Sequence, residues 1–319
     1  MVSLIWLILG LVGLWIGTEL AVRSALSVAD RYQLSHVFVG LTILAVGTDL
    51  PELVVAVSAS VERLGGVETS SIVVGNAIGS AVAQITLVLG IAGLASYLTL
   101  SRKNVVADGF SMLGAIILLG LLGADGNLSR LDGAVLLVGF GAYWVALFSR
   151  EDVATKVRRH TSGVPWSQVL ALVGGIIVLV LSSEAVVDHA VRLAEILGVR
   201  QSLVAILIIG FGTSLPELAI SVKAVQAQGT GLSVGNLIGS NIFDILVPVG
   251  LGSSISELRM EPNLTLFDLP FLFVVSSMAL VFLVRKRRLQ GREALVLLGA
   301  YVLYAMLKTS GEFVPGLGI

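Results

Sequence analysis

The 319-residue sequence predicts an all-α membrane protein of ten transmembrane helices, built as two inverted five-helix repeats with broken helices at the membrane midplane. Hydrophobic residues make up 56% of the chain and charged residues only 13%, whereas soluble domains contain about 25% charged residues. Ten segments also have the roughly 20 apolar residues that a helix needs to cross a bilayer core. Finally, two short signatures occur twice, about half a chain length apart.

The ten apolar segments follow one another with short polar connections. The longest connection is basic and falls between the fifth and sixth segments. We therefore divide the chain into a first five-helix repeat (1–149), a connecting loop on the cytoplasmic side (150–166) and a second five-helix repeat (167–319). The segments lie near residues 3–24, 37–61, 70–97, 106–123, 131–148, 167–188, 202–226, 231–254, 266–284 and 292–309.

Composition also excludes several function classes. The net charge of −1 offers no basic surface for nucleic acid, and no nucleotide-binding motif is present. The chain has no cysteine, so it forms neither a disulfide nor a thiolate metal site. The first apolar run lacks a basic leading region and a clear cleavage site, so we expect a retained helix rather than a signal peptide. The predicted location is the cell membrane, with the lipid bilayer as a partner.

The first signature reads AVGTDLPEL at 45–53 and GFGTSLPEL at 210–218, a spacing of 165 residues. The second reads VGNAIGS at 74–80 and VGNLIGS at 234–240, a spacing of 160. Each half is therefore one five-helix unit. Because five is odd, the second unit enters the membrane from the opposite side, as in the inverted repeats of many transporters.

Loop charge predicts the orientation, because basic residues gather on the cytoplasmic side. With both termini outside, thirteen basic residues face inward and six face outward, with Lys223 unassigned. The inward set is Arg23, Arg31, Arg102, Lys103, Arg150, Lys156, Arg158, Arg159, Arg285, Lys286, Arg287, Arg288 and Arg292, and the outward set is Arg63, Arg130, Arg192, Arg200, Arg259 and Lys308.

The first signature predicts a helix break at mid-membrane. Pro216 lacks an N–H and clashes with the carbonyl four residues earlier, at the flexible Gly212. Irregular backbone at that depth is tolerated only inside protein or beside water. Freed carbonyls, the hydroxyls of Thr213 and Ser214 and the Glu217 carboxylate would then supply oxygen ligands at one level. Because Ca²⁺ takes six to eight oxygens, two such units would have to meet.

The second signature adds oxygen from the next helix. Gln84 follows Ser80 by four residues, and Asp244 follows Ser240 by four, which places each pair on one helix face. For the repeated glycines we expect close helix packing. These are Gly75, Gly79, Gly235 and Gly239.

Glu52 and Glu217 have no Lys or Arg nearby in their segments except Lys223. A buried, unpaired carboxylate stays neutral or needs a cation, so both residues are predicted ion ligands. Nucleophilic catalysis is poorly supported, because Thr213 and Ser214 have no nearby His base. We therefore do not expect an enzyme or a bound cofactor.

With GTDLPE and GTSLPE each followed by a GNxIGS segment, the sequence resembles the cation/calcium antiporter superfamily, and most closely its prokaryotic sodium/calcium exchangers. The resemblance covers essentially the whole chain. It implies cation sites at the membrane centre that open to each side in turn, with Glu52 and Glu217 as shared Ca²⁺ ligands. It also implies that the helices carrying Glu19 and Glu184 slide as gates. The ligands it implies are the Ala45 and Gly210 carbonyls, Thr48, Asp49, Glu52, Ser80, Gln84, Thr213, Ser214, Glu217, Ser240 and Asp244.

Three positions depart from the usual pattern of that family. Asp49 stands where a Ser is expected, Ala81 where the second copy has Asn241, and Gln84 where Asn or Asp is common. The site would then hold four carboxylates, and at least one of them should carry a proton at neutral pH.

Three functions remain open from the sequence. The first is a secondary antiporter that exchanges Ca²⁺ for Na⁺ by alternating access. The second is the same scaffold coupled to H⁺, or carrying another divalent cation. The third is a cation channel, which inverted halves with broken helices disfavour. In each case the transported partners are small inorganic cations.

Overall fold

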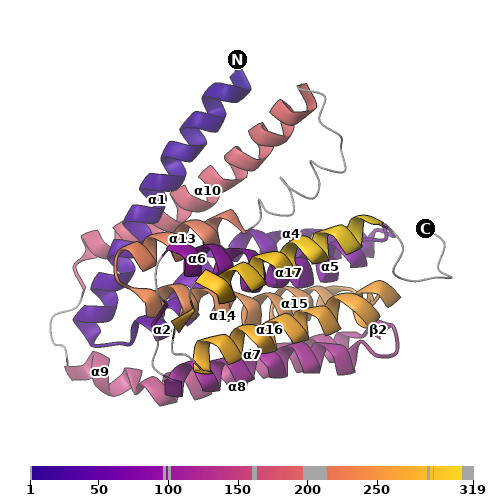
Figure 1. Cartoon of the computed structure of the whole chain (residues 1–319). Coiled ribbons are helices and arrows are strands. Elements are labelled where there is room, and N and C mark those ends of the chain that lie inside the picture. The colour runs from indigo at the N-terminus through magenta and orange to yellow at the C-terminus, as the bar shows by residue number, and fades with distance from the viewer. Residues whose placement is uncertain are drawn as a thin grey trace.

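The computed structural model describes residues 2–95, 98–99, 102–159, 164–196, 214–285, 288–289 and 291–310, and they are mostly helical (Figure 1). The first half comprises α1 (Val2–Tyr32), α2 (His36–Val39), η1 (Gly40–Leu44), α3 (Ala45–Thr48), α4 (Leu50–Leu64), α5 (Ser70–Ala83), η2 (Gln84–Val88), α6 (Leu89–Ala95), β1 (Leu98–Thr99), α7 (Arg102–Leu122), β2 (Asn127–Leu128), α8 (Arg130–Glu151) and α9 (Val153–Arg159). The second comprises α10 (Trp166–Ile196), α13 (Leu215–Gln226), α14 (Thr230–Leu246), α15 (Pro248–Ile255), β3 (Leu258–Arg259), η4 (Leu264–Asp268), α16 (Leu269–Arg285), β4 (Arg288–Leu289) and α17 (Gly291–Ser310).

The helices coincide with the segments expected from the sequence. Among the described residues, seven helical stretches are long and apolar enough to cross a membrane, and a bent pair makes an eighth. α17 matches the tenth expected segment. α13 matches the end of the seventh, whose beginning lies outside the described residues. The connecting loop differs from expectation, because it contains the short helix α9, which begins after a left-handed residue at Asp152 (φ 53°).

The core is organised around α14, in which every residue from Leu232 to Leu246 is buried. This helix contacts α2, η1, α3, α5, α7 and α13. In contrast, α1 and α10 lie side by side and stand out from the rest of the bundle (Figure 1). They run antiparallel, and a Cβ on Gly17 would lie 2.8 Å from the Gly175 carbonyl oxygen. Small residues therefore let these two helices approach closely.

Two short strand pairs join the halves of the chain. β1 pairs antiparallel with β4, aligning Leu98 with Leu289, and β2 pairs antiparallel with β3, aligning Leu128 with Leu258. β3 begins 160 residues after β1, and β4 begins 161 residues after β2. Exchanging the two halves of the chain therefore converts one strand pair into the other.

Two buried aspartates, one in each half of the chain, form ion pairs at positions related by the repeat. Arg150 Nη2 lies 2.5 Å from Asp108 Oδ1, and Lys308 Nζ lies 2.8 Å from Asp268 Oδ2. Both aspartates are 1% exposed, so each needs its cation to offset the cost of burial. The first pair connects α7 to α8, and the second connects η4, which leads directly into α16, to α17.

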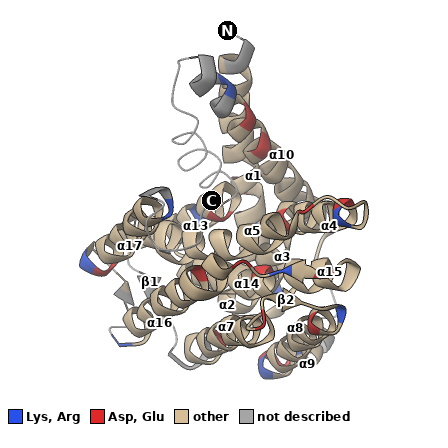
Figure 2. Cartoon of the chain, turned by 90° about the vertical axis from the view of Figure 1, so that its right-hand side faces the viewer, with Lys and Arg blue, Asp and Glu red and all other residues tan. Residues whose placement is uncertain are grey.

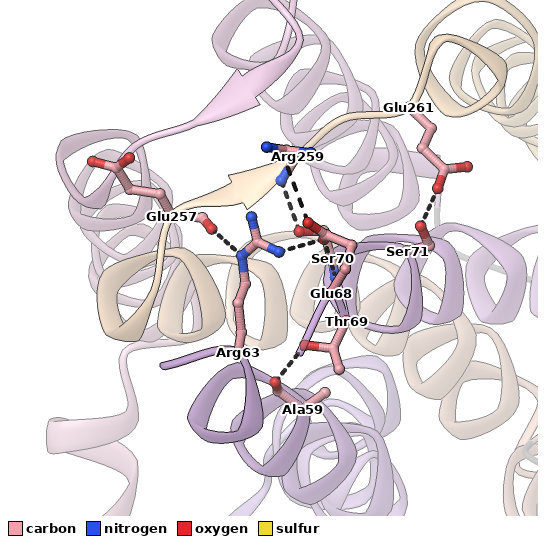
Figure 3. Close-up of polar contacts among 9 residues, drawn as sticks. All are labelled: Ala59, Arg63, Glu68, Thr69, Ser70, Ser71, Glu257, Arg259 and Glu261. Carbon is pink, nitrogen blue, oxygen red and sulfur yellow. Dashed lines mark hydrogen bonds and ion pairs between the residues drawn. The ribbon is translucent and has the colours of Figure 1, made fainter. Parts of the chain in front are cut away.

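A polar cluster fixes the turn between α4 and α5 against β3 (Figure 3). Arg63 pairs with Glu68, and its Nε donates to the Glu257 carbonyl at 2.5 Å. The Arg259 amide donates to Ser70 Oγ at 2.9 Å. Hydrogen bonds from Arg63 and Ser70 lower the pKa of Glu68 to about 2, so this carboxylate is charged at neutral pH.

The repeated glycines serve packing in one half only. A Cβ on Gly239 would lie 2.8 Å from the Cα and carbonyl oxygen of Leu41, and one on Gly235 would strike the Val37 backbone. A Cβ on Gly79 meets nothing within 4 Å, and one on Gly75 makes an ordinary contact. The expectation of close packing therefore holds for Gly235 and Gly239.

This difference predicts unequal effects of one substitution at repeat-related positions. Gly239→Ala should lower the free energy of unfolding by about 1–3 kcal/mol, because the neighbouring backbone must shift. Gly79→Ala, the matched control, should cost less than about 1 kcal/mol, because the space is open. Thermal unfolding of the two purified variants checks the prediction. Equal losses in both would contradict it.

Candidate cation-binding site

The first helix break lies where the sequence predicts it. α3 ends at Thr48, α4 begins at Leu50, and Asp49 between them has φ −88° and ψ 5°. The helix axis bends by 46° between the two arms. The break is a sharp bend rather than an unwound loop, because helical backbone bonds persist on both sides of Asp49. Pro51 has no N–H, so the Gly47 carbonyl loses its helical donor.

The start of α13 has the same local geometry as the start of α4. Ser214 has φ −92° and ψ 10°, which is close to the backbone of Asp49, and α13 begins immediately after it with Pro216 in its first turn. The preceding residues, including the predicted ligands Gly210 and Thr213, lie outside the described part of the chain. The two signatures therefore fold alike wherever both are described.

Four buried carboxylates lie around these helix starts. Asp49, Glu217 and Asp244 are 0% exposed and Glu52 is 2% exposed. Among the described residues, none of the four pairs with a Lys or Arg. Both oxygens of Asp49, Glu52 and Glu217 lack a hydrogen-bond partner among the described residues. Asp49 and Glu217 lie close enough for the charge of one carboxyl group to act on the other.

The four carboxylates do not form a metal cage by themselves. Within the described ranges, no three acidic or His side chains converge closely enough to hold a metal ion. A bound cation would therefore also need neutral oxygens from hydroxyls, amides or backbone carbonyls, which hard cations accept readily.

Gln84 links the two halves at the centre of the site. Its Nε2 donates to Ser80 Oγ at 3.2 Å and to Asp244 Oδ2 at 3.1 Å, and its Oε1 accepts from Asn241 Nδ2 at 2.7 Å. The expected face that Ser80 shares with Gln84 is thus formed. Gln84 is also the first residue of η2, and such π-type turns within helices are frequent at functional sites.

The other predicted oxygen ligands that the structure describes are also buried. Thr48 Oγ1 donates to the Leu44 and Ala45 carbonyls at 3.1 and 3.3 Å. The Ala45 carbonyl also accepts the Asp49 amide at 3.0 Å, so it is engaged in the helix. The hydroxyls of Ser214 and Ser240 are buried, and no partner reaches them within the described residues.

A cavity of about 300 Å³ reaches the site from the surface between α4 and α10. It ends on Glu52 and Pro216 and opens beside Glu184 and Asp188, which are exposed. Glu19 occupies the corresponding position on α1 and pairs instead with Arg23 and Lys223. The full lining is Pro51, Glu52, Val55, Asn76, Val180, Ser183, Glu184, Val187, Asp188 and Pro216.

Sequence reasoning missed a repeated asparagine. Asn76 lines the cavity beside Glu52, and its counterpart Asn236 is fully buried with neither amide atom paired among the described residues. Both lie inside the second signature, which we interpreted only through its glycines and serines. The repetition of this polar residue in an apolar helix was the signal that could have found it.

Comparison with known proteins places the chain among exchangers. A sequence profile described as sodium/calcium exchanger protein matches residues 2–149 and 167–310. The sodium/calcium exchanger MaX1 of Methanosarcina acetivorans is 26% identical, over 96% of this chain and 98% of its own. An uncharacterized membrane protein of Methanocaldococcus jannaschii is 31% identical, over 93% and 95%.

Solved structures agree with the sequence comparison. The sodium–calcium exchanger NCX_Mj, soaked without Na⁺ and Ca²⁺, superposes with a TM-score of 0.80 at 29% identity, covering 96% of this chain and 98% of its own. The same exchanger soaked with Na⁺ and Sr²⁺ gives a TM-score of 0.80 at 28% identity. This integral membrane protein belongs to the sodium/calcium exchanger family.

Proposed function

We propose that the protein is a secondary antiporter that exchanges Ca²⁺ for Na⁺ by alternating access. The observation that carries this proposal is the set of four buried carboxylates without basic partners among the described residues. Uncompensated charge of this kind is costly in a membrane and is explained by a transported cation. The family profile that matches both halves of the chain and the full-length relative MaX1 are both described as sodium/calcium exchangers.

We further propose that ten transmembrane helices form two inverted five-helix repeats, 1–149 and 167–319, joined by 150–166. The exchanged strand pairs β1–β4 and β2–β3 support this arrangement. The ion pairs Asp108–Arg150 and Asp268–Lys308 support it too, because they join α7 to α8 and η4 to α17 at the end of each half.

In the proposed site, Glu52 and Glu217 are the shared Ca²⁺ ligands, because each lies in the first turn of its helix and has two oxygens without a hydrogen-bond partner among the described residues. Inverted halves bring such helix starts together at the midplane. The neutral hydroxyl, amide and carbonyl groups complete the oxygen shell that the carboxylates alone do not supply. The further ligands are Ala45, Thr48, Asp49, Ser80, Gln84, Gly210, Thr213, Ser214, Ser240 and Asp244.

The helices α1 and α10 are the proposed gates. They contact each other extensively and stand apart from the bundle, so they can slide as a pair without disturbing α14 (Figure 1). Both termini are proposed to lie outside, since thirteen basic residues then face the cytoplasm against six outside.

Replacement of either shared ligand tests the proposal. In proteoliposomes, Glu52→Gln or Glu217→Gln should reduce Na⁺-driven ⁴⁵Ca uptake roughly a hundredfold, because a lost buried charge partner costs about 3 kcal/mol. The melting temperature without cations should stay equal or rise, because an uncompensated buried charge is removed. The increase in melting temperature that Ca²⁺ causes in the wild type should disappear in the variants.

Glu62→Gln is the matched control, because Glu62 lies on the same helix as Glu52 but is exposed. It should leave both readouts unchanged. Wild-type exchange by Glu217→Gln would contradict the ligand role. Equal ⁴⁵Ca flux by the wild type with and without a counter-gradient would instead identify a channel.

Asp49 favours H⁺ coupling as the second candidate function. Its carboxyl group is fully buried near that of Glu217, at the position where the second half has the neutral Ser214. Two carboxylates at such range do not both stay ionised without a cation. A proton held between them would take the place of one Na⁺.

Asp49→Ser tests the proton role. With the shared proton removed, uptake should depend less steeply on pH between about 5 and 8 and more strongly on Na⁺. The measurement is ⁴⁵Ca uptake under separate Na⁺ and pH gradients. Ser214→Ala serves as the control at the matching position and should keep the wild-type pH profile. Identical pH and Na⁺ profiles for the wild type and Asp49→Ser would rule the proton role out.

A further inference from the structure

Two exposed carboxylates lie at the outer end of the cavity, which we call its mouth. Glu184 and Asp188 lie one turn apart on α10, so they project from the same helix face. Both line the cavity that leads inward to Glu52. Figure 2 shows acidic residues on α10 where it stands out from the bundle. These residues belong to neither repeated signature.

The inner end of this cavity is built to receive a cation. Glu52 is 2% exposed, and neither of its carboxylate oxygens has a hydrogen-bond partner among the described residues. Asn76 adds an amide to the same wall, and Ser183 adds a buried hydroxyl from α10. An ion that enters between Glu184 and Asp188 therefore meets only oxygen-bearing or apolar groups before it reaches Glu52.

The repeat-related positions in the first half of the chain carry a different charge. The spacing of 165 that relates Glu52 to Glu217 also relates Glu19 to Glu184 and Arg23 to Asp188. Glu19 is held in ion pairs by Arg23 and Lys223. The position that matches Lys223 is Ser58. The first-half positions thus combine one carboxylate with two cations, whereas Glu184 and Asp188 are two carboxylates without an ion-pair partner among the described residues.

Nearby cations do not cancel the acidic mouth. Arg192 lies one turn beyond Asp188 and is exposed, but it does not line the cavity. His189 stacks on Trp6 with ring centroids 6.0 Å apart. Within the described residues, neither Glu184 nor Asp188 has an ion-pair partner. Among the described residues, the charged groups that line this cavity are therefore all carboxylates.

We propose that Glu184 and Asp188 form a recruitment site for hydrated Ca²⁺ at this mouth alone, which delivers the ion to Glu52. The site rests on the proposed function and adds a difference between the two sides of the membrane. Its carboxylates are exposed, so they hold the ion loosely through its water shell. A negative mouth with low-dielectric walls raises the local cation concentration and the on-rate, and salt screens the effect.

The test compares the full-length wild type with the double variant Glu184→Gln/Asp188→Asn in right-side-out and inside-out membrane vesicles. Initial ⁴⁵Ca uptake is measured against Ca²⁺ concentration at ionic strengths of about 0.01 M and about 1 M, where the Debye length falls from about 30 to about 3 Å. In one vesicle polarity, the variant should raise the KM for Ca²⁺ about tenfold at low salt. This difference should vanish at high salt and be absent in the other polarity.

Two controls isolate the site. Glu62→Gln/Glu257→Gln removes two exposed carboxylates outside the cavity and should leave KM unchanged. Glu184→Asp/Asp188→Glu keeps both charges and should keep the wild-type KM, which separates charge from misfolding. An unchanged KM at low salt, or an equal rise in both polarities, would overturn the proposal. Absence of Na⁺-driven uptake in the wild type would instead reject the proposed function.

Discussion

The structure depends on buried carboxylates that it does not neutralise with its own basic residues. Asp49, Glu52, Glu217 and Asp244 are almost fully buried, and no Lys or Arg pairs with them among the described residues. Burial of an unpaired charge costs several kcal/mol, and elsewhere the same protein avoids that cost. Asp108 and Asp268 are equally buried, and each has its own cation. The contrast separates structural carboxylates from those left available to a transported ion.

Local backbone geometry helps to position these carboxylates. Asp49 and Ser214 stand directly before α4 and α13 with nearly the same backbone angles, and each precedes a Leu-Pro-Glu sequence. The buried helix α14 then brings Asp244 against Gln84 of the other half. The two halves are alike in backbone but not in charge. Asp49 in the first half corresponds to Ser214 in the second, and Gln84 in the first corresponds to Asp244 in the second. A single cation site built from both halves is consequently asymmetric.

Much of this arrangement could be predicted from the sequence. Hydropathy located the helices, and Pro51 and Pro216 located the starts of α4 and α13, because a missing N–H acts locally wherever the chain folds. The four-residue spacing placed Gln84 beside Ser80 for the same reason. The partners of these residues depend on tertiary packing. Three such contacts join positions far apart in the chain, and no local pattern specifies them. They are the ion pair between Glu19 and Lys223, the contact of Gln84 with Asn241 and the cavity beside Asn76.

The central claim is that a divalent cation binds between Glu52 and Glu217. Crystals soaked with Sr²⁺ in place of Ca²⁺, in the absence of Na⁺, would show the ion directly through its anomalous scattering. The account predicts a single strong anomalous peak between the two carboxylates, within coordination distance of both, and its loss in Glu217→Gln. A peak confined to exposed carboxylates such as Glu184, with none between Glu52 and Glu217 at saturating Sr²⁺, would contradict it.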